Sequence, residues 1–152
     1  MKSMIILGAL SALATGIAIG TQSTLGSRIG ALIGNLRTGL WMNAIGGTIA
    51  GVLILLLFLT QGKDSLEISA NAFRMLILAG ALGILIVTGV AFSLQRTGVA
   101  AGLATIILGQ LTLSVIIDTK GWGSTAPIAF TWQRAFGLFI MAVAIYLLLP
   151  KE

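Results

Sequence analysis

The residues best suited to chemistry gather in one apolar stretch. The segment "GQLTLSVIID", residues 109–118, carries Gln110, Thr112, Ser114 and Asp118 among leucine, isoleucine and valine. On a helix, Gln110, Ser114 and Asp118 stand at i, i+4 and i+8 and share one face. Thr112 falls on another face and can bond its own backbone carbonyl. An amide, a hydroxyl and a carboxylate in one row can bind a polar solute, pair with a cation or join two helices.

The composition excludes several other kinds of chemistry. The 152 residues include no cysteine and no histidine, and only four are acidic. Cys/His chemistry and the common metal sites are therefore absent, and intramembrane hydrolases need a nucleophile with a base or a pair of carboxylates. The nine basic residues are scattered singly and form no patch for nucleic acid. The sequence predicts a protein that is no enzyme, uses no cofactor and binds no nucleic acid.

Five apolar stretches must position the polar row. The chain is 57% hydrophobic and 9% charged, with a mean hydropathy of +1.08. A bilayer-spanning helix needs about 20 apolar residues, and suitable stretches occupy residues 4–20, 40–59, 73–94, 99–117 and 131–149. We predict an all-α integral membrane protein, with residues 1–152 forming one five-span domain in the lipid bilayer. The first stretch follows Lys2 and could instead be a cleaved signal peptide, but its length and the four later spans favour a membrane helix.

The loop charges leave the orientation nearly balanced. With five spans, one side of the membrane carries Lys2, Lys63, Arg74, Lys120 and Arg134, and the other carries Arg28, Arg37, Arg96 and Lys151. Orientation normally follows an excess of lysine and arginine in the cytoplasmic loops. Either the chain inserts both ways and forms an antiparallel homodimer, or a few charges or a partner chain fix one orientation. We predict dual topology.

Glycines spaced four apart predict close contacts between helices. They occur in "GIAIG" (16–20), "GSRIGALIG" (26–34), "GGTIAG" (46–51) and "GVAAG" (98–102), and small residues on one face let helix backbones approach. If the first span continues through the second repeat, Arg28 faces the interior and becomes a candidate for anion binding. Otherwise Arg28 and Arg37 extend to the lipid headgroups.

Other polar residues in the spans have two interpretations each. Gln22 and Asn43 are amides that could meet the row on the fourth span, and for Asn43 packing is the favoured interpretation. Gln110 either bonds a neighbouring helix or contacts substrate. Asp118 is either an interfacial carboxylate paired with Lys120 or Arg134, or a gating or ion-coupling group.

The order of these motifs resembles a known family. Gln22 after a glycine-rich first span, "GGTIAG", "AGALG" (79–83), "RTGVAAG" (96–102), "GQLTLSVIID" and "WQRAFGLFI" (132–140) are similar to YdcZ-like proteins of the drug/metabolite transporter superfamily. The resemblance implies small bacterial inner-membrane proteins, half-size relatives of ten-span EamA-like exporters, that occur singly, in pairs or as fusions. Gln22, Gln110, Ser114 and Asp118 match the family pattern, whereas Gly26 replaces its usual asparagine.

These observations predict a secondary transporter or exporter of a small metabolite or xenobiotic. Two antiparallel chains, or a chain and a paired homologue, would expose a shared cavity alternately to each side. Gln22, Gln110, Ser114 and Asn43 would bind substrate, and Asp118 and Arg28 would serve gating or ion coupling. The sequence has no GxxxxGK[ST] loop for ATP, so active transport would use a gradient. The alternatives are a passive ion or small-solute channel and a non-transporting membrane assembly subunit.

Overall fold

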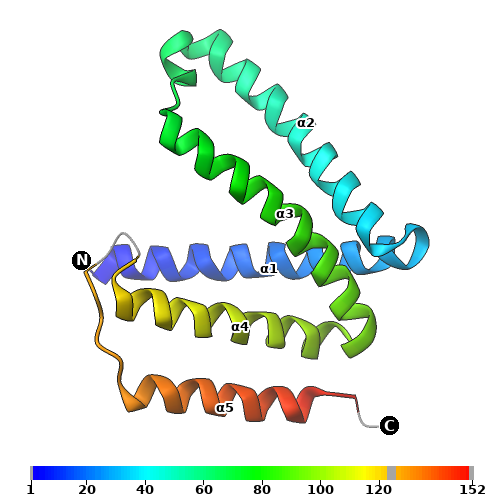
Figure 1. Cartoon of the computed structure of the whole chain (residues 1–152), viewed down its shortest axis with the longest axis vertical. Helices are drawn as coiled ribbons and strands as arrows, with labels where there is room; N and C mark the ends of the chain where they lie inside the picture. Colours follow the sequence, from blue (N-terminus) through cyan, green and yellow to red (C-terminus); the bar gives the residue numbers. More distant parts are fainter. Residues whose placement is uncertain (1, 123–125, 151–152) are drawn as a thin grey trace. The chain divides into compact units, whose positions relative to one another are not determined.

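All regular secondary structure in the described part of the chain is helical (Figure 1). The computed structural model describes residues 2–122 and 126–150, with the backbone alone for residues 2, 3, 64 and 65. The elements in order are α1 (Lys2–Ile33), α2 (Asn35–Gln61), the 3-10 helix η1 (Lys63–Leu66), α3 (Ala70–Thr97), α4 (Val99–Lys120) and α5 (Trp132–Leu148). They form two compact units, Met1–Phe92 and Ser93–Glu152, and α3 continues across the boundary. The all-α prediction is confirmed.

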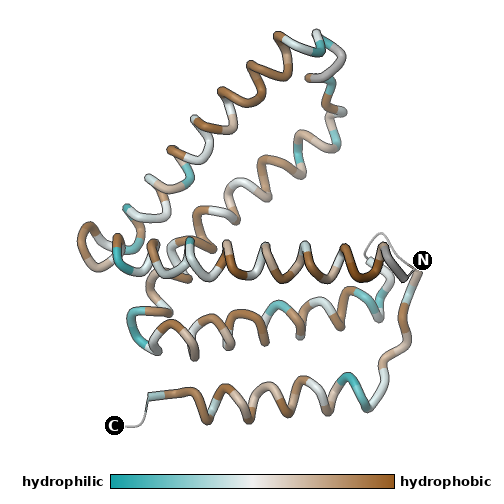
Figure 2. The backbone as a smooth tube through the Cα atoms, turned by 180° about the vertical axis from the view of Figure 1, so that it is seen from behind, coloured by the Kyte–Doolittle hydropathy of each residue, from teal (hydrophilic) through white to brown (hydrophobic). Residues whose placement is uncertain are grey.

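The helices have the length and surface of membrane helices. Among the described residues, four helices, α1 to α4, are long and apolar enough to cross a bilayer, and α5 is a shorter apolar helix. Most large apolar side chains are exposed, and the buried apolar ones in the described chain are Ala91, Leu94, Ala101 and Ile145. Figure 2 shows hydrophobic residues along the helices and polar ones mainly near their ends. Such a surface is stable in lipid, where helices satisfy their own backbone groups.

Helix α1 extends well beyond the expected span at residues 4–20. It continues through the second glycine repeat to Ile33, for 32 residues, or about 48 Å at 1.5 Å per residue. The polar residues after Gly20 do not interrupt it, because hydroxyls such as those of Thr21 and Thr24 donate to the carbonyls of Ile17 and Gly20. A hydroxyl satisfied in this way can stay in an apolar helix.

A single glycine separates α1 from α2. Gly34 has φ 90° and ψ 147°, a backbone conformation that is open to glycine and strained for other residues. Its N–H donates to the Gly30 carbonyl at 2.9 Å, and its own carbonyl accepts the N–H of Thr38 at 3.0 Å and the Thr38 hydroxyl at 2.9 Å. The chain therefore passes from α1 to α2 with almost no loss of backbone hydrogen bonding.

Small residues hold the helices of the first unit together. A Cβ added to Gly26 on α1 would lie 3.5 Å from the Met42 sulfur of α2. Ser23 is 8% exposed, Thr38 is fully buried, and Gly26, Gly30 and Gly39 are buried as well. By contrast, nothing described lies within 4 Å of a Cβ added at Gly8, Gly16, Gly46, Gly47 or Gly51. The packing role expected of the glycine repeats is thus confirmed at Gly26, and also at the buried Gly102 of "GVAAG", where a Cβ would lie 2.8 Å from Oγ1 of Thr97.

The second unit contains a helical hairpin of α4 and α5. Gly121 ends α4 in the left-handed conformation, φ 66°, with its N–H bonded to the Asp118 carbonyl and the Trp122 N–H bonded to the Ile117 carbonyl. This pair of bonds is a Schellman motif. The Thr131 hydroxyl caps the start of α5 by accepting the Arg134 N–H at 3.4 Å. The 17 residues of α5 cover about 26 Å.

Candidate functional site

The polar row on α4 is present, but its members are engaged differently. Gln110 and Ser114 are both exposed. The Ser114 hydroxyl donates to the backbone carbonyl of Gln110 at 2.8 Å, and the Thr112 hydroxyl donates in the same way to Leu108 at 2.8 Å. Ser114 has therefore used its proton and can only accept a further hydrogen bond. Gln110 retains the fullest capacity to bind a solute or a neighbouring helix.

Asp118 forms an ion pair with the first turn of α5. Its Oδ2 lies 3.5 Å from Nη1 of Arg134, and the side chains are 37% and 30% exposed, respectively. Of the two cations considered from the sequence, Lys120 and Arg134, the structure selects Arg134. The Asp118 backbone carbonyl also accepts the N–H groups of Gly121 and Ile128. This residue thus ties the end of α4 to the segment that leads into α5.

The strength of the Asp118–Arg134 ion pair can be measured with a double-mutant cycle. Asp118→Asn and Arg134→Gln should each lower the free energy of unfolding by about 0.2–1 kcal/mol, the range for partly exposed ion pairs. The exchange Asp118→Arg with Arg134→Asp should recover part of that loss. Unfolding in detergent, followed by circular dichroism, gives the coupling energy. Lys120→Gln is the matched control, and additive effects of the two single variants would contradict the pairing.

The candidates of the first unit lie on α1 and α2. Gln22 and Arg28 are exposed on α1; the helix continues past Arg28, but within the described chain this side chain does not face a buried interior. Asn43 is half-buried on α2 and donates from Nδ2 to the Gly39 carbonyl at 2.8 Å. Of these three, Gln22 is the exposed amide whose position on a long apolar helix fits solute contact.

A polar seam between α2 and α3 was not predicted from the sequence. A Cβ on Gly39 would overlap the Thr88 hydroxyl and lie 2.9 Å from the Ile84 carbonyl oxygen, and a Cβ on Gly83 would lie 3.0 Å from Oδ1 of Asn43. Each helix thus presents a glycine to a polar side chain of the other. The glycine in "TGL" (38–40) and the threonine in "VTGV" (87–90) were the available signals, but neither indicates its partner.

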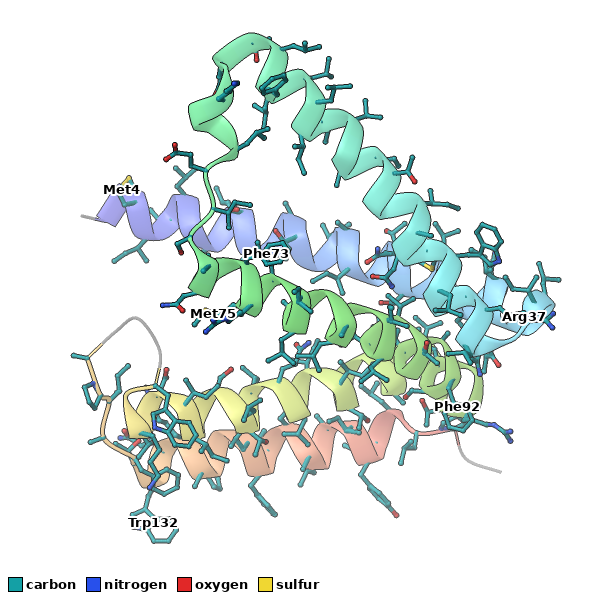
Figure 3. All side chains as sticks on the ribbon, turned by 45° about the horizontal axis from the view of Figure 1, so that its top comes forward. Met4, Arg37, Phe73, Met75, Phe92 and Trp132 are labelled. Carbon is teal, nitrogen blue, oxygen red and sulfur yellow. The ribbon has the colours of Figure 1, made fainter. Side chains whose placement is uncertain are left out.

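Outside the polar row, the described surface carries a mainly aromatic hollow on α5. Within residues 2–122 and 126–150, no group of three or more His, Cys, Asp or Glu side chains could hold a metal ion. A hollow of about 540 Å³ lies along α5, lined by Trp132, Gln133, Ala135, Phe136 and Phe139. Trp132 points outward at the start of α5 in Figure 3, and the Phe136 and Phe139 rings stack at 6.4 Å. This mainly aromatic face suits lipid contact better than recognition of a polar solute.

Comparison with known families decides the class of this protein. Residues 7–147 match the model of the family DMT_YdcZ, whose description is "Putative inner membrane exporter, YdcZ". This chain belongs to the YdcZ family. Its assignment to the inner membrane follows from that match and from the four long apolar helices. The exporter named in that description implies a transporter and no enzyme. No curated protein and no solved structure matches the chain.

Proposed function

We propose that this YdcZ-family protein is a secondary exporter of a small metabolite or xenobiotic. The observation that carries the proposal is the exposed amide of Gln110 on α4, a helix of membrane-spanning length. A polar side chain at membrane depth is costly unless it meets a polar partner or a water-filled path. Transport supplies such a path, and the family match supports it.

Two antiparallel copies would form the complete exporter. The nearly equal loop charges support insertion in both orientations, and transporters built from inverted repeats place their substrate near the bilayer midplane, between the repeats. Rocking of one copy against the other would open the cavity to each side in turn. Because the sequence has no ATP-binding loop, a solute or ion gradient supplies the energy.

The proposed roles follow from the hydrogen-bond donors, acceptors and charges that each side chain can still present to a solute. Gln110 and Gln22 orient the solute through their amides, and Ser114 adds an acceptor because its proton is already used within α4. Asn43 contributes the second proton of Nδ2, since the first is donated to the Gly39 carbonyl and Oδ1 faces Gly83. Asp118 acts in a gate through its ion pair with Arg134. Arg28 attracts anions to the opening on its side of the membrane.

Cysteine labelling tests the antiparallel arrangement directly, because the chain contains no native cysteine. Leu66→Cys in η1 and Val99→Cys at the start of α4 are suitable, since both residues are exposed and neither carries charge. Lys63 and Arg96 are avoided because replacing them changes the charge balance, and Gly98 is avoided because its φ is 77°.

We expect an impermeant maleimide to label each single-cysteine variant from both sides of the inner membrane, with about half the molecules accessible from each. Spheroplasts and inverted vesicles provide the two sides, and the unsubstituted chain is the control for background labelling. Labelling of Leu66→Cys from one side and Val99→Cys from the other would rule out dual topology for the chain expressed alone.

A further inference from the structure

The α2–α3 seam contains a hydroxyl without a hydrogen bond. Thr88 Oγ1 is buried and has no partner among the described residues. The other described threonines within helices each donate to the carbonyl four residues back; they are Thr15, Thr21, Thr24, Thr38, Thr48, Thr60, Thr97, Thr105, Thr112 and Thr119. Among the described threonines within helices, Thr88 is therefore the one whose hydroxyl lacks this bond.

The reason for the departure lies on the facing helix. The carbonyl that Thr88 would normally use belongs to Ile84, and both oxygens face Gly39 of α2. Gly39 is buried and lies so near that an added Cβ would overlap the Thr88 hydroxyl. At such a distance the glycine Cα–H groups can contact both oxygens, a weak but favourable interaction. The close approach of α2 to α3 at Gly39 thus accompanies the loss of one hydrogen bond within α3.

The contact is local, and joins the start of α2 to the middle and second half of α3. Gly39 and Asn43 of α2 meet Thr88 and Gly83 of α3, whereas a Cβ added further toward η1 would meet nothing within 4 Å. These open positions are Gly46, Gly47 and Gly51 on α2 and Gly80 on α3. The two helices are continuous through the seam, so a change there moves each helix as a rod.

We propose that the Gly39–Thr88 contact is a two-state pivot between α2 and α3. In the closed state, Gly39 packs against the Thr88 hydroxyl, which is left without a partner. In the open state, α2 withdraws and Thr88 turns to donate to the Ile84 carbonyl. The gain in packing offsets the lost hydrogen bond, so the two states are close in free energy and α2 can swing within one chain. This movement is distinct from the rocking of two chains and does not depend on it.

Spin-label distances test the pivot without any substrate. Labels are attached at Leu56→Cys on α2 and Ile77→Cys on α3, which are 52% and 60% exposed and lie on the side of the seam toward η1. Pulsed dipolar spectroscopy in lipid nanodiscs should give two distances for the otherwise unsubstituted chain. Thr88→Val keeps the shape but removes the orphan hydroxyl, so it should raise the ratio of short to long distances about fivefold or more.

Matched variants separate the pivot from general effects on packing. Gly39→Ala should shift the populations to the long distance, because its Cβ cannot fit against the Ile84 carbonyl. Thr88→Ser should stay near the parent ratio. Thr48→Val on α2 removes a hydroxyl that is bonded within its own helix and should change nothing.

An unchanged ratio in Thr88→Val would overturn the pivot, even if Gly39→Ala lengthened the distance, because the hydroxyl would then take no part. A shift of both variants in the same direction would overturn it as well. If Gly39→Ala fails to fold, the comparison of Thr88→Val with Thr88→Ser still decides the question.

Discussion

Gly34→Ala is expected to lower the free energy of unfolding by about 1–3 kcal/mol, the usual cost of a residue held in a sparsely populated backbone region. Gly34 has φ 90° and ψ 147° and is the one residue between α1 and α2. Its N–H and carbonyl both take part in the hydrogen bonds of the flanking helices, so the backbone cannot relax without breaking one of them. Thermal and denaturant unfolding in detergent, followed by circular dichroism, measure the loss.

Gly8→Ala is the control for this substitution. Gly8 lies inside α1, and nothing described is within 4 Å of its added Cβ. Alanine is the better helix former by about 1 kcal/mol, so this variant should match or exceed the parent in stability. Equal stability of Gly34→Ala and the parent would mean that the junction adopts another conformation.

Gln110→Ala is expected to reduce solute flux about tenfold or more, as when a binding site loses one amide partner and leaves the solute's polar group unpaired. Gln110 is exposed and its backbone carbonyl, which survives the substitution, already accepts the Ser114 hydroxyl. The fold should therefore be unchanged. The measurement is flux into proteoliposomes, with a solute first found by screening a labelled metabolite mixture against the parent protein.

Thr112→Val is the matched control on the same helix. Its hydroxyl is bonded to Leu108 within α4, so the substitution should leave flux near the parent value. Loss of dimer in Gln110→Ala would favour the interpretation of this residue as an adhesive between helices. Unitary currents from the parent protein, in place of saturable flux, would favour a channel.

The sequence predicted the helices better than their ends. Hydropathy alone identified every apolar segment, because lipid admits few other structures. It could not place the end of α1, since hydropathy counts Thr21 and Thr24 as polar, whereas their hydroxyls are bonded inside the helix. Gly34 terminates α1 through its backbone conformation, and glycines of the same repeat that stay helical look identical in sequence.

The candidate site was predictable to the extent that it depends on one helix. The shared face of Gln110, Ser114 and Asp118 follows from helical spacing, and the choice between Lys120 and Arg134 required the α4–α5 hairpin. The seam at Gly39 and Thr88 could not be predicted, because a threonine in an apolar helix normally bonds its own backbone. Only the neighbouring helix shows that this one does not.

The unequal lengths of α1 and α5 mean that the two helices match the thickness of a membrane differently. Helix α1, at about 48 Å, exceeds the bilayer core of about 30 Å, whereas α5, at about 26 Å, falls short of it. A long helix accommodates the mismatch by tilting or by projecting from the membrane, and a short one by thinning the lipid around it. Where α5 crosses the bilayer, we expect the lipid around it to be thinned, and lipids with shorter acyl chains to relieve that deformation. Acyl chain length is thus expected to act on this membrane protein through the mismatch of a single helix.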